Sequence, residues 1–307
     1  MNGVVNINKP SGLTSRDVVD LLRDLYRIKK AGHAGTLDPG ATGVLLLCLG
    51  HGTRIVRFLM DQEKEYRAEI TFGTATDTAD SYGRVIKEAD ASFLTADQVI
   101  AALPSFTGEI QQVPPMVSAI RHQGKKLYQL ARAGVTVERQ ARSVTIHQLR
   151  YTGGKGWGSH SPRAEILLTC SKGTYVRTLC EDIGNHLGCV AHMSSLVRTR
   201  VGSFDIADSV NPEELNNLDI SQIIISTGAA LSWMPEVAVK AGAVNSVRSG
   251  AKLFLPGIDS LPEVLAAGSH VRLYGEGELL AVAETAFDPK DNSRVMFKPV
   301  CVLTSGL

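Results

Sequence analysis

The sequence has few cysteines and no long hydrophobic run. Its 307 residues include five cysteines, and none of them forms a C-x-x-C pair. We therefore expect reduced, structural thiols, and a zinc site is not expected. The longest apolar runs, such as residues 43–50, fall far short of the roughly 20 residues that a membrane helix needs. The N-terminus has no export or transit signal, so we expect a cytoplasmic protein without a membrane segment.

The sequence also has almost no net charge, with 32 basic and 31 acidic residues. Taken whole, this balance argues against a nucleic-acid-binding protein, because such domains are usually clearly basic. The charge is unevenly distributed, however, since residues 205–307 contain 7 Lys or Arg and 13 Asp or Glu. Residues 118–150 instead contain seven basic side chains against Glu138 alone. That segment is either a solvated helix face or a surface for a phosphate backbone.

The chain length and a change in sequence pattern near residue 234 predict two domains. The first combines strands and helices. Its expected strands are 4–6, 44–49, 64–72, 144–151, 164–170 and 196–206, and its expected helices are 15–28, 53–60, 95–103, 127–133, 174–187 and 211–233. From residue 234 onward the sequence changes to short β-runs between Gly and Asp turns. We therefore predict an α+β domain over residues 1–233 and a small β-rich domain over residues 234–307.

Asp38 is the most distinctive candidate for chemistry. It lies in an expected loop, residues 32–43, that contains four glycines and one proline. A residue before proline favours extended backbone, and glycines allow backbone or substrate to approach closely. Alone, such a segment is usually only a turn. Tyr66 on the apolar face of its strand and Arg177 in the first turn of its helix would likewise be ordinary core and surface residues without further evidence.

Six segments resemble, in order and spacing, the motifs of the TruB family of tRNA pseudouridine synthases. The segment around Asp38, GHAGTLDPGATGVL at 32–45, resembles the catalytic motif of that family. The others are KPSGLTS at 9–15, KEYRA at 64–68, TDTADSYG at 76–83, VPPMVSA with GKKLYQLAR at 113–132, and KGTYVRTL at 172–179. The resemblance covers about residues 3–204. It implies a pseudouridine synthase fold of the α+β class with a mixed, mainly antiparallel central sheet.

The resemblance implies that the enzyme isomerises uridine 55 in the T-loop of tRNA to pseudouridine. The C1′–N1 bond breaks, the uracil turns in place, and C1′ forms a new bond to C5. No net redox change or hydrolysis occurs, so neither a cofactor nor a metal is expected. The target nucleotide must first be flipped out of the RNA stack, at a cost of a few kcal/mol.

The family motifs also assign roles to residues of the expected site. Asp38 matches the catalytic carboxylate, which acts as a nucleophile or stabilises positive charge that develops on the sugar. A carboxylate that must stay ionised in a dry pocket needs a cation beside it, and the matched residue is Arg177. Tyr66 matches the tyrosine that stacks on the uracil, with its hydroxyl available for proton transfer at C5. Tyr175 and Leu196 match positions that line the uracil pocket.

The same comparison assigns an RNA-binding surface. By resemblance, His33 fills part of the gap that the flipped nucleotide leaves in the RNA loop. Residues 118–150 become a basic thumb that tracks phosphates, with Lys125, Lys126 and Arg132 as its contacts. Lys9 is expected to support the catalytic loop rather than to touch RNA.

Three questions stay open at the level of sequence. The domain from residue 234 stands where many members carry a PUA domain, and it either contacts the tRNA acceptor end or is a structural appendage. A dyskerin-like synthase directed by a guide RNA is an alternative enzyme, and a non-catalytic tRNA-folding chaperone is an alternative of another class. We take a monomer as the default state.

Overall fold

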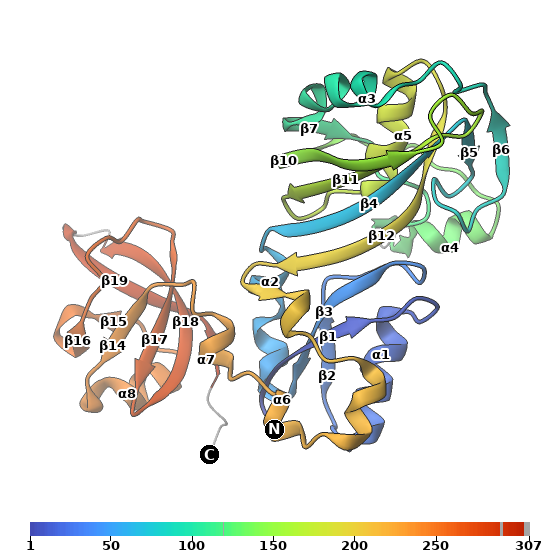
Figure 1. Ribbon diagram of the computed structural model, residues 1–307. Coiled ribbons are helices and arrows are strands. Elements are labelled where there is room, and N and C mark those ends of the chain that lie inside the picture. Colours follow the sequence, from blue (N-terminus) through green and yellow to red (C-terminus); the bar gives the residue numbers. More distant parts are fainter. Residues whose placement is uncertain (119, 289–290, 304–307) are drawn as a thin grey trace.

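The computed structural model describes residues 1–118, 120–288 and 291–303, and side chains are described for these residues except 132, 288 and 291–294. The chain forms two β-sheet units joined by irregular segments (Figure 1). A nine-stranded sheet forms the core of the first unit, and a six-stranded sheet forms the second. None of the helices in these ranges has the length and apolar character needed to cross a membrane.

The nine-stranded sheet has the order β1-β3-β12-β4-β11-β10-β7, with β2 paired to β3 and β13 paired to β12. Its strands are β1 (Gly3–Lys9), β2 (Ala31–Ala34), β3 (Thr42–Leu49), β4 (Lys64–Phe72), β7 (Gly108–Gln112), β10 (Arg142–Lys155), β11 (Arg163–Cys170), β12 (Ala191–Val201) and β13 (Phe204–Asp205). The β12 and β3 strands are parallel, and the other pairings in this sheet are antiparallel. The expectation of a mixed, mainly antiparallel sheet is thereby confirmed.

The helices that cover this sheet are short. They are α1 (Ser15–Leu25), α2 (Val56–Met60), α3 (Ala96–Ala102) and α5 (Val176–His186). Two of them, α1 and α3, begin with a capping box. Helix α1 begins at Ser15 because the Thr14 side chain accepts from the Asp17 amide while the Asp17 carboxylate accepts from the Thr14 amide. Its buried face packs on β1 and β3, whereas α3 and α5 pack against β4, β10 and β11 in a separate core.

Three expected segments were wrong. Residues 31–34 form strand β2 rather than a loop, because they pair with β3 in a register that local glycine content cannot show. Residues 74–83, whose polar sequence predicts a loop, are partly extended, since β5 (Thr74–Thr76) pairs with β6 (Val85–Glu88). Residues 211–233 do not form one helix: caps restart the chain as a 3-10 turn (Pro212–Asn217), α6 (Ile220–Ile223) and α7 (Thr227–Ala230).

The second sheet has the order β15-β19-β18-β17-β14-β16. Its elements are β14 (Glu236–Val239), α8 (Ala241–Arg248), β15 (Leu253–Phe254), β16 (Ile258–Ser260), β17 (His270–Gly275), β18 (Glu278–Asp288) and β19 (Asp291–Val302). The short β-runs predicted after residue 234 are thus present. Helix α8, which the sequence did not predict, buries Val244 and Val247 in the core of this unit.

The two units share an apolar cluster. Phe58 and Leu59 of α2 pack in one cluster with Leu279 and Val282 of β18. Two guanidinium groups strengthen the contact: Arg54 donates to the Val302 carbonyl at 2.8 Å, and Arg57 donates to the Val300 carbonyl at 2.6 Å. The second unit is therefore docked on a helix whose end reaches the cavity described next.

Candidate active site

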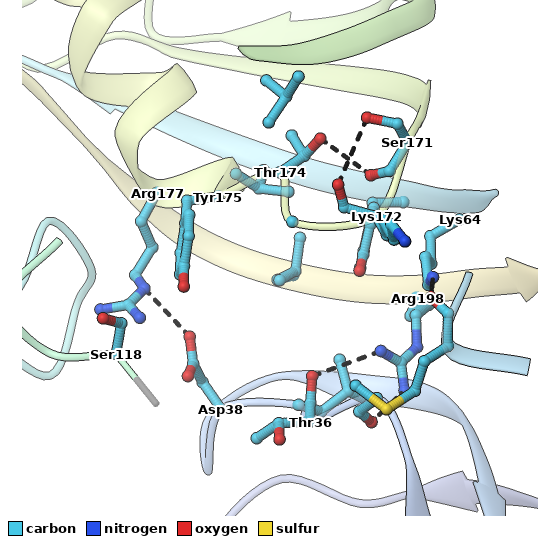
Figure 2. A pocket seen from close by; sticks show the side chains of 18 of the residues that line it. Thr36, Asp38, Lys64, Ser118, Ser171, Lys172, Thr174, Tyr175, Arg177 and Arg198 are labelled. Carbon is cyan, nitrogen blue, oxygen red and sulfur yellow. Dashed lines mark hydrogen bonds and ion pairs between the residues drawn. The ribbon is translucent and has the colours of Figure 1, made fainter. Parts of the chain in front are cut away.

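A cavity of about 580 Å³ opens where the loop between β2 and β3 meets β4, β12 and the start of α5 (Figure 2). All five residues expected around the uracil line this cavity: Asp38, Tyr66, Tyr175, Arg177 and Leu196. They come from four separate segments of the chain. The sheet order explains how they meet, because β12 lies between β3, which follows the Asp38 loop, and β4, which carries Tyr66.

Asp38 and Arg177 form an ion pair across the cavity. The Nε atom of Arg177 lies 3.0 Å from Oδ2 of Asp38, and Figure 2 shows the two side chains pointing toward one another. Only 4% of the Arg177 side chain is exposed, against 39% for Asp38. The arginine is therefore a fixed part of the wall, while the carboxylate faces the space where a ligand would lie.

Three further acceptors hold the Arg177 guanidinium. It donates to the Thr78 carbonyl at 3.1 Å and to the Val117 carbonyl at 2.8 Å, and it lies 3.7 Å from a carboxylate oxygen of Asp80. Asp80 in turn accepts from the Thr78 hydroxyl at 2.7 Å. Since a guanidinium presents several donors in one rigid plane, this arrangement fixes the direction from which it meets Asp38.

Burial raises the pKa of the Asp38 carboxyl above its usual value, and the nearby Asp80 raises it further, whereas Arg177 and Lys9 lower it. The cation expected beside Asp38 is present, but the net direction of the pKa is still upward. Arg177 thus offsets part of the cost of burial rather than all of it.

The segment 9–15 supports the loop that carries Asp38. Lys9 is fully buried, and its ammonium donates to the carbonyls of Leu13 at 2.6 Å and Pro39 at 3.1 Å. The Ser15 hydroxyl exchanges hydrogen bonds with the backbone of Leu37. This geometry agrees with a supporting role for Lys9, since its donors are bonded to backbone carbonyls rather than directed into the cavity.

Aromatic and aliphatic side chains form the other walls. Tyr66 is buried on β4, and burial raises the pKa of its hydroxyl. Tyr175, just before α5, is held by Gln112, whose amide accepts from the Tyr175 N–H at 3.0 Å and donates to its carbonyl at 3.2 Å. Leu196 is buried on β12. Aromatic and aliphatic walls beside a carboxylate suit a planar base next to its sugar.

The expected RNA contacts lie outside the lining of this cavity. His33 lies on β2, and burial lowers its pKa, as do the charges of Arg198, Arg16 and Lys126. Lys125 and Lys126 form strand β9 (Lys125–Lys126), which pairs with β8 (Arg121–His122) and leads into α4 (Leu127–Arg132). The side chain of Arg132 lies outside the described part of the chain. Residues 121–132 of the basic segment therefore form a small hairpin and helix, and its last residues, from Arg142, belong to β10.

Sequence reasoning missed two buried cations that line the cavity, Lys64 and Arg198. Arg198 is 1% exposed, and Lys64 donates to the carbonyls of Met60 and Gln62. A signal for Arg198 was available, because alternation along a strand places Leu196 and Arg198 on one face. An arginine on a strand is nevertheless expected at the surface until its partners are known.

Known protein families match this chain over most of its length. Residues 23–176 match the family described as TruB family pseudouridylate synthase (N terminal domain), and residues 177–223 match the tRNA pseudouridylate synthase B C-terminal domain. Residues 235–298 match the PUA domain.

Curated relatives and solved structures agree with these matches. The chain is 55% identical over 307 residues to tRNA pseudouridine synthase B of Pelotomaculum thermopropionicum, covering 99% of this chain and 97% of the relative. It is 43% identical to the protein of the same name from Moorella thermoacetica, covering 98% and 99%. A solved Cbf5-Nop10-Gar1 complex contains a chain with 27% identity and a TM-score of 0.77, covering 98% of this chain and 85% of that one.

Fold and site together define a pseudouridine synthase with a C-terminal PUA domain. The higher identities are to the synthases that act on tRNA, whereas the Cbf5 complex is more distant. The chain belongs to the TruB family, and its activity is the isomerisation of uridine in tRNA.

Proposed function

We propose that this enzyme converts uridine 55 in the T-loop of tRNA to pseudouridine and that Asp38 is its catalytic carboxylate. The observation that carries the proposal is the Asp38–Arg177 ion pair at 3.0 Å in one cavity with Tyr66. Asp38 faces C1′ of the flipped nucleotide, where positive charge develops as the bond to N1 breaks. The electron pair of that bond stays on the uracil, which turns and forms a new bond from C5 to C1′. C5 then loses its proton, and N1 gains one.

The remaining side chains of the site bind and orient. Arg177 keeps Asp38 ionised and correctly directed. Tyr66 stacks on the uracil, and Tyr175 and Leu196 close the slot around it. His33 contacts the bases of the RNA loop that the flipped nucleotide leaves behind.

We propose that residues 1–233 form the catalytic domain and that residues 234–307 form the PUA domain. Within the first, residues 118–150 form the thumb, in which Lys125, Lys126 and Arg132 contact phosphates of the T-arm. The PUA domain contacts the acceptor end of the same tRNA. We propose a monomer that acts in the cytoplasm, where its tRNA substrate is found.

The experiment that tests Asp38 is its replacement by asparagine, assayed by single-turnover formation of pseudouridine on tRNA. We expect Asp38→Asn to abolish the reaction while tRNA affinity stays within about threefold, because the change removes a charge but little volume. Asp61→Asn is the matched control, since Asp61 lines the same cavity but pairs with Lys172 at its exposed rim. A near-normal rate for Asp38→Asn contradicts the proposal.

The same assay separates the two alternatives. Formation of pseudouridine in a bare T-arm hairpin, with no other RNA present, excludes a requirement for a guide. A protein that binds and refolds tRNA without forming pseudouridine is the non-catalytic chaperone. The presence of Asp38, Arg177 and Tyr66 in one cavity favours the enzyme over that chaperone.

A further inference from the structure

Arg198 is a deeply buried charged residue that the proposed reaction has not yet used. It lies on β12, lines the cavity and is 1% exposed. Its guanidinium donates to three backbone carbonyls, those of Val44 at 2.7 Å, Gly35 at 3.2 Å and Thr36 at 3.4 Å. The last two belong to the loop that carries Asp38, and Figure 2 shows Arg198 beside Thr36. One side chain thus ties the catalytic loop to the central sheet.

Within the described part of the chain, no carboxylate forms an ion pair with this charge. None of the ion pairs found among the described residues includes Arg198. Burying a cation without a counter-ion is costly, and carbonyl dipoles offset only part of that cost. Its field also reaches its neighbours, since burial and the added repulsion of Arg198 lower the pKa of Lys64 to about 8. A plain structural link between loop and sheet would not need a charge at this place.

Two glycines of the catalytic segment lie close to Arg198. Gly43 has φ +100°, and a Cβ atom there would lie 2.2 Å from the Arg198 carbonyl oxygen. Gly35 has φ +97°, and a Cβ atom there would lie 3.5 Å from Nη1 of the Arg198 side chain. Both positions favour glycine through their backbone angle, and Gly43 also requires it for space. The glycines that bracket Asp38 therefore allow β12 and its arginine to approach the loop.

Arg198 also reaches the candidate stacking residue. Tyr66 lies directly opposite Arg198 on the neighbouring strand β4, and both residues line the cavity. Burial raises the pKa of Tyr66, and the charge of the Arg198 guanidinium lowers it. Because a guanidinium has donors only, a phenol oxygen beside it can act only as an acceptor toward it, which leaves the phenolic proton for another acceptor. Arg198 is thus a neighbour of both the catalytic loop and the candidate stacking residue.

We infer that Arg198 is a positioning residue for the isomerisation, which clamps the catalytic loop at Gly35 and Thr36 and acts on the hydroxyl of Tyr66 on the adjacent strand. The inference rests on the proposed function of the Asp38 site. It predicts that part of the contribution of Arg198 to the rate passes through the Tyr66 hydroxyl, which a purely structural role would not require.

A double-mutant cycle with Arg198→Lys and Tyr66→Phe tests this link on a T-arm hairpin. Lysine keeps the charge but cannot bond the loop carbonyls and the phenol together. We expect Arg198→Lys to lower the single-turnover rate about 30-fold in the wild type but only about fivefold in the Tyr66→Phe background, because coupled residues are not additive. Hairpin affinity should stay within about threefold throughout.

Arg200→Lys is the matched control, since Arg200 lies two residues further along β12 and pairs with Glu65 near the surface. It should leave the rate within about twofold. Equal losses from Arg198→Lys in both backgrounds, a near-normal rate, or a loss confined to affinity would overturn the inference. If Arg198→Lys fails to fold, Arg198→Gln, which is neutral and can still donate to one carbonyl, is used in the same cycle.

A second measurement needs no catalysis. Ultraviolet titration of the wild type, with Tyr66→Phe subtracted, reports ionisation of Tyr66, and Arg198→Gln should move it to higher pH because the guanidinium lowers this pKa. An unmoved titration overturns the link between Arg198 and Tyr66. A wild type that forms no pseudouridine in the hairpin but shows the shift instead contradicts the proposed substrate.

Discussion

Replacing Arg177 with lysine keeps a positive charge beside Asp38 but removes most of the bonds that direct it. In the wild type the guanidinium pairs with Asp38 at 3.0 Å and donates to the carbonyls of Thr78 at 3.1 Å and Val117 at 2.8 Å. A single ammonium group on a straight chain cannot span these three acceptors together. The variant therefore tests whether Asp38 needs a charge nearby or a charge held in one geometry.

The size of the effect follows from the bonds that are lost. A hydrogen bond from a charged donor contributes about 1.5–3 kcal/mol, so the loss of two such bonds amounts to about 3–4 kcal/mol at the lower end of that range. If this loss falls on the transition state, the rate of pseudouridine formation drops about 100- to 1,000-fold. Affinity for tRNA should change by no more than about threefold, because Arg177 is 4% exposed and faces Asp38 rather than the RNA backbone.

Single-turnover formation of pseudouridine with saturating enzyme measures the rate, and filter binding measures the affinity. Arg163→Lys is the matched control, since Arg163 lies at an exposed position on β11, away from the cavity, and pairs with Glu69 of β4. A rate for Arg177→Lys within about tenfold of the wild type would refute the geometric argument. So would a loss that appears entirely as weaker binding.

The pH dependence gives an independent readout of the same pair. The pKa of Asp38 is raised above 3.8 by burial and held down in part by Arg177. Activity requires the carboxylate, so it should fall as the pH drops through this raised pKa, and the acid limb of kcat/KM should lie above pH 3.8. Arg177→Gln, which removes the cation, should move that limb to still higher pH. An unmoved limb would show that Arg177 does not act on the ionisation of Asp38.

Two further predictions concern the thumb and the contact between the two units. Changing Lys125 and Lys126 to alanine should weaken tRNA binding and reduce the log–log salt slope by about 2, because each phosphate contact contributes nearly one unit; an unchanged slope would remove these residues from the RNA surface. Phe58→Ala should lower the free energy of unfolding by about 3–5 kcal/mol in urea titrations, because Phe58 is buried beside His270 and Arg57 where the units meet. A loss below about 1 kcal/mol would show that the two units do not depend on this contact.

Local signals were sufficient for much of the fold. The capping residues Thr14 and Thr95 marked the starts of α1 and α3 because a side-chain cap is a short-range interaction that the sequence displays directly. Strict alternation over β4 showed that Tyr66 faces inward for the same reason. Where stability comes from distant partners, the sequence misled: β2 looks like a glycine loop until its register with β3 is known.

The residues of the site also divide into those that a sequence signal marks and those that depend on distant partners. Asp38, Tyr66 and Arg177 could be predicted together because each lies in a segment that resembles a family motif, although periodicity alone would have left Tyr66 in the core and Arg177 on a surface. Alternation along the strand places Arg198 on the face of Leu196, but its role could not be predicted, since its partners are backbone carbonyls, which every residue has and no sequence pattern marks. Residues that act through the main chain of another segment are visible only once the segments are placed.

The near-zero net charge of the chain is the sum of a basic segment and an acidic C-terminal part. Within the basic segment 118–150, residues 121–132 form a hairpin and a short helix, while the acidic excess lies in residues 205–307. Two cations of the cavity are of another kind, since Arg177 and Arg198 are buried and bonded to the protein itself. Salt in solution screens exposed charges far more than buried ones. Raising the ionic strength should therefore weaken RNA capture by the exposed basic residues while leaving the rate of the bound complex nearly unchanged, because the ion pair that holds Asp38 includes the buried Arg177.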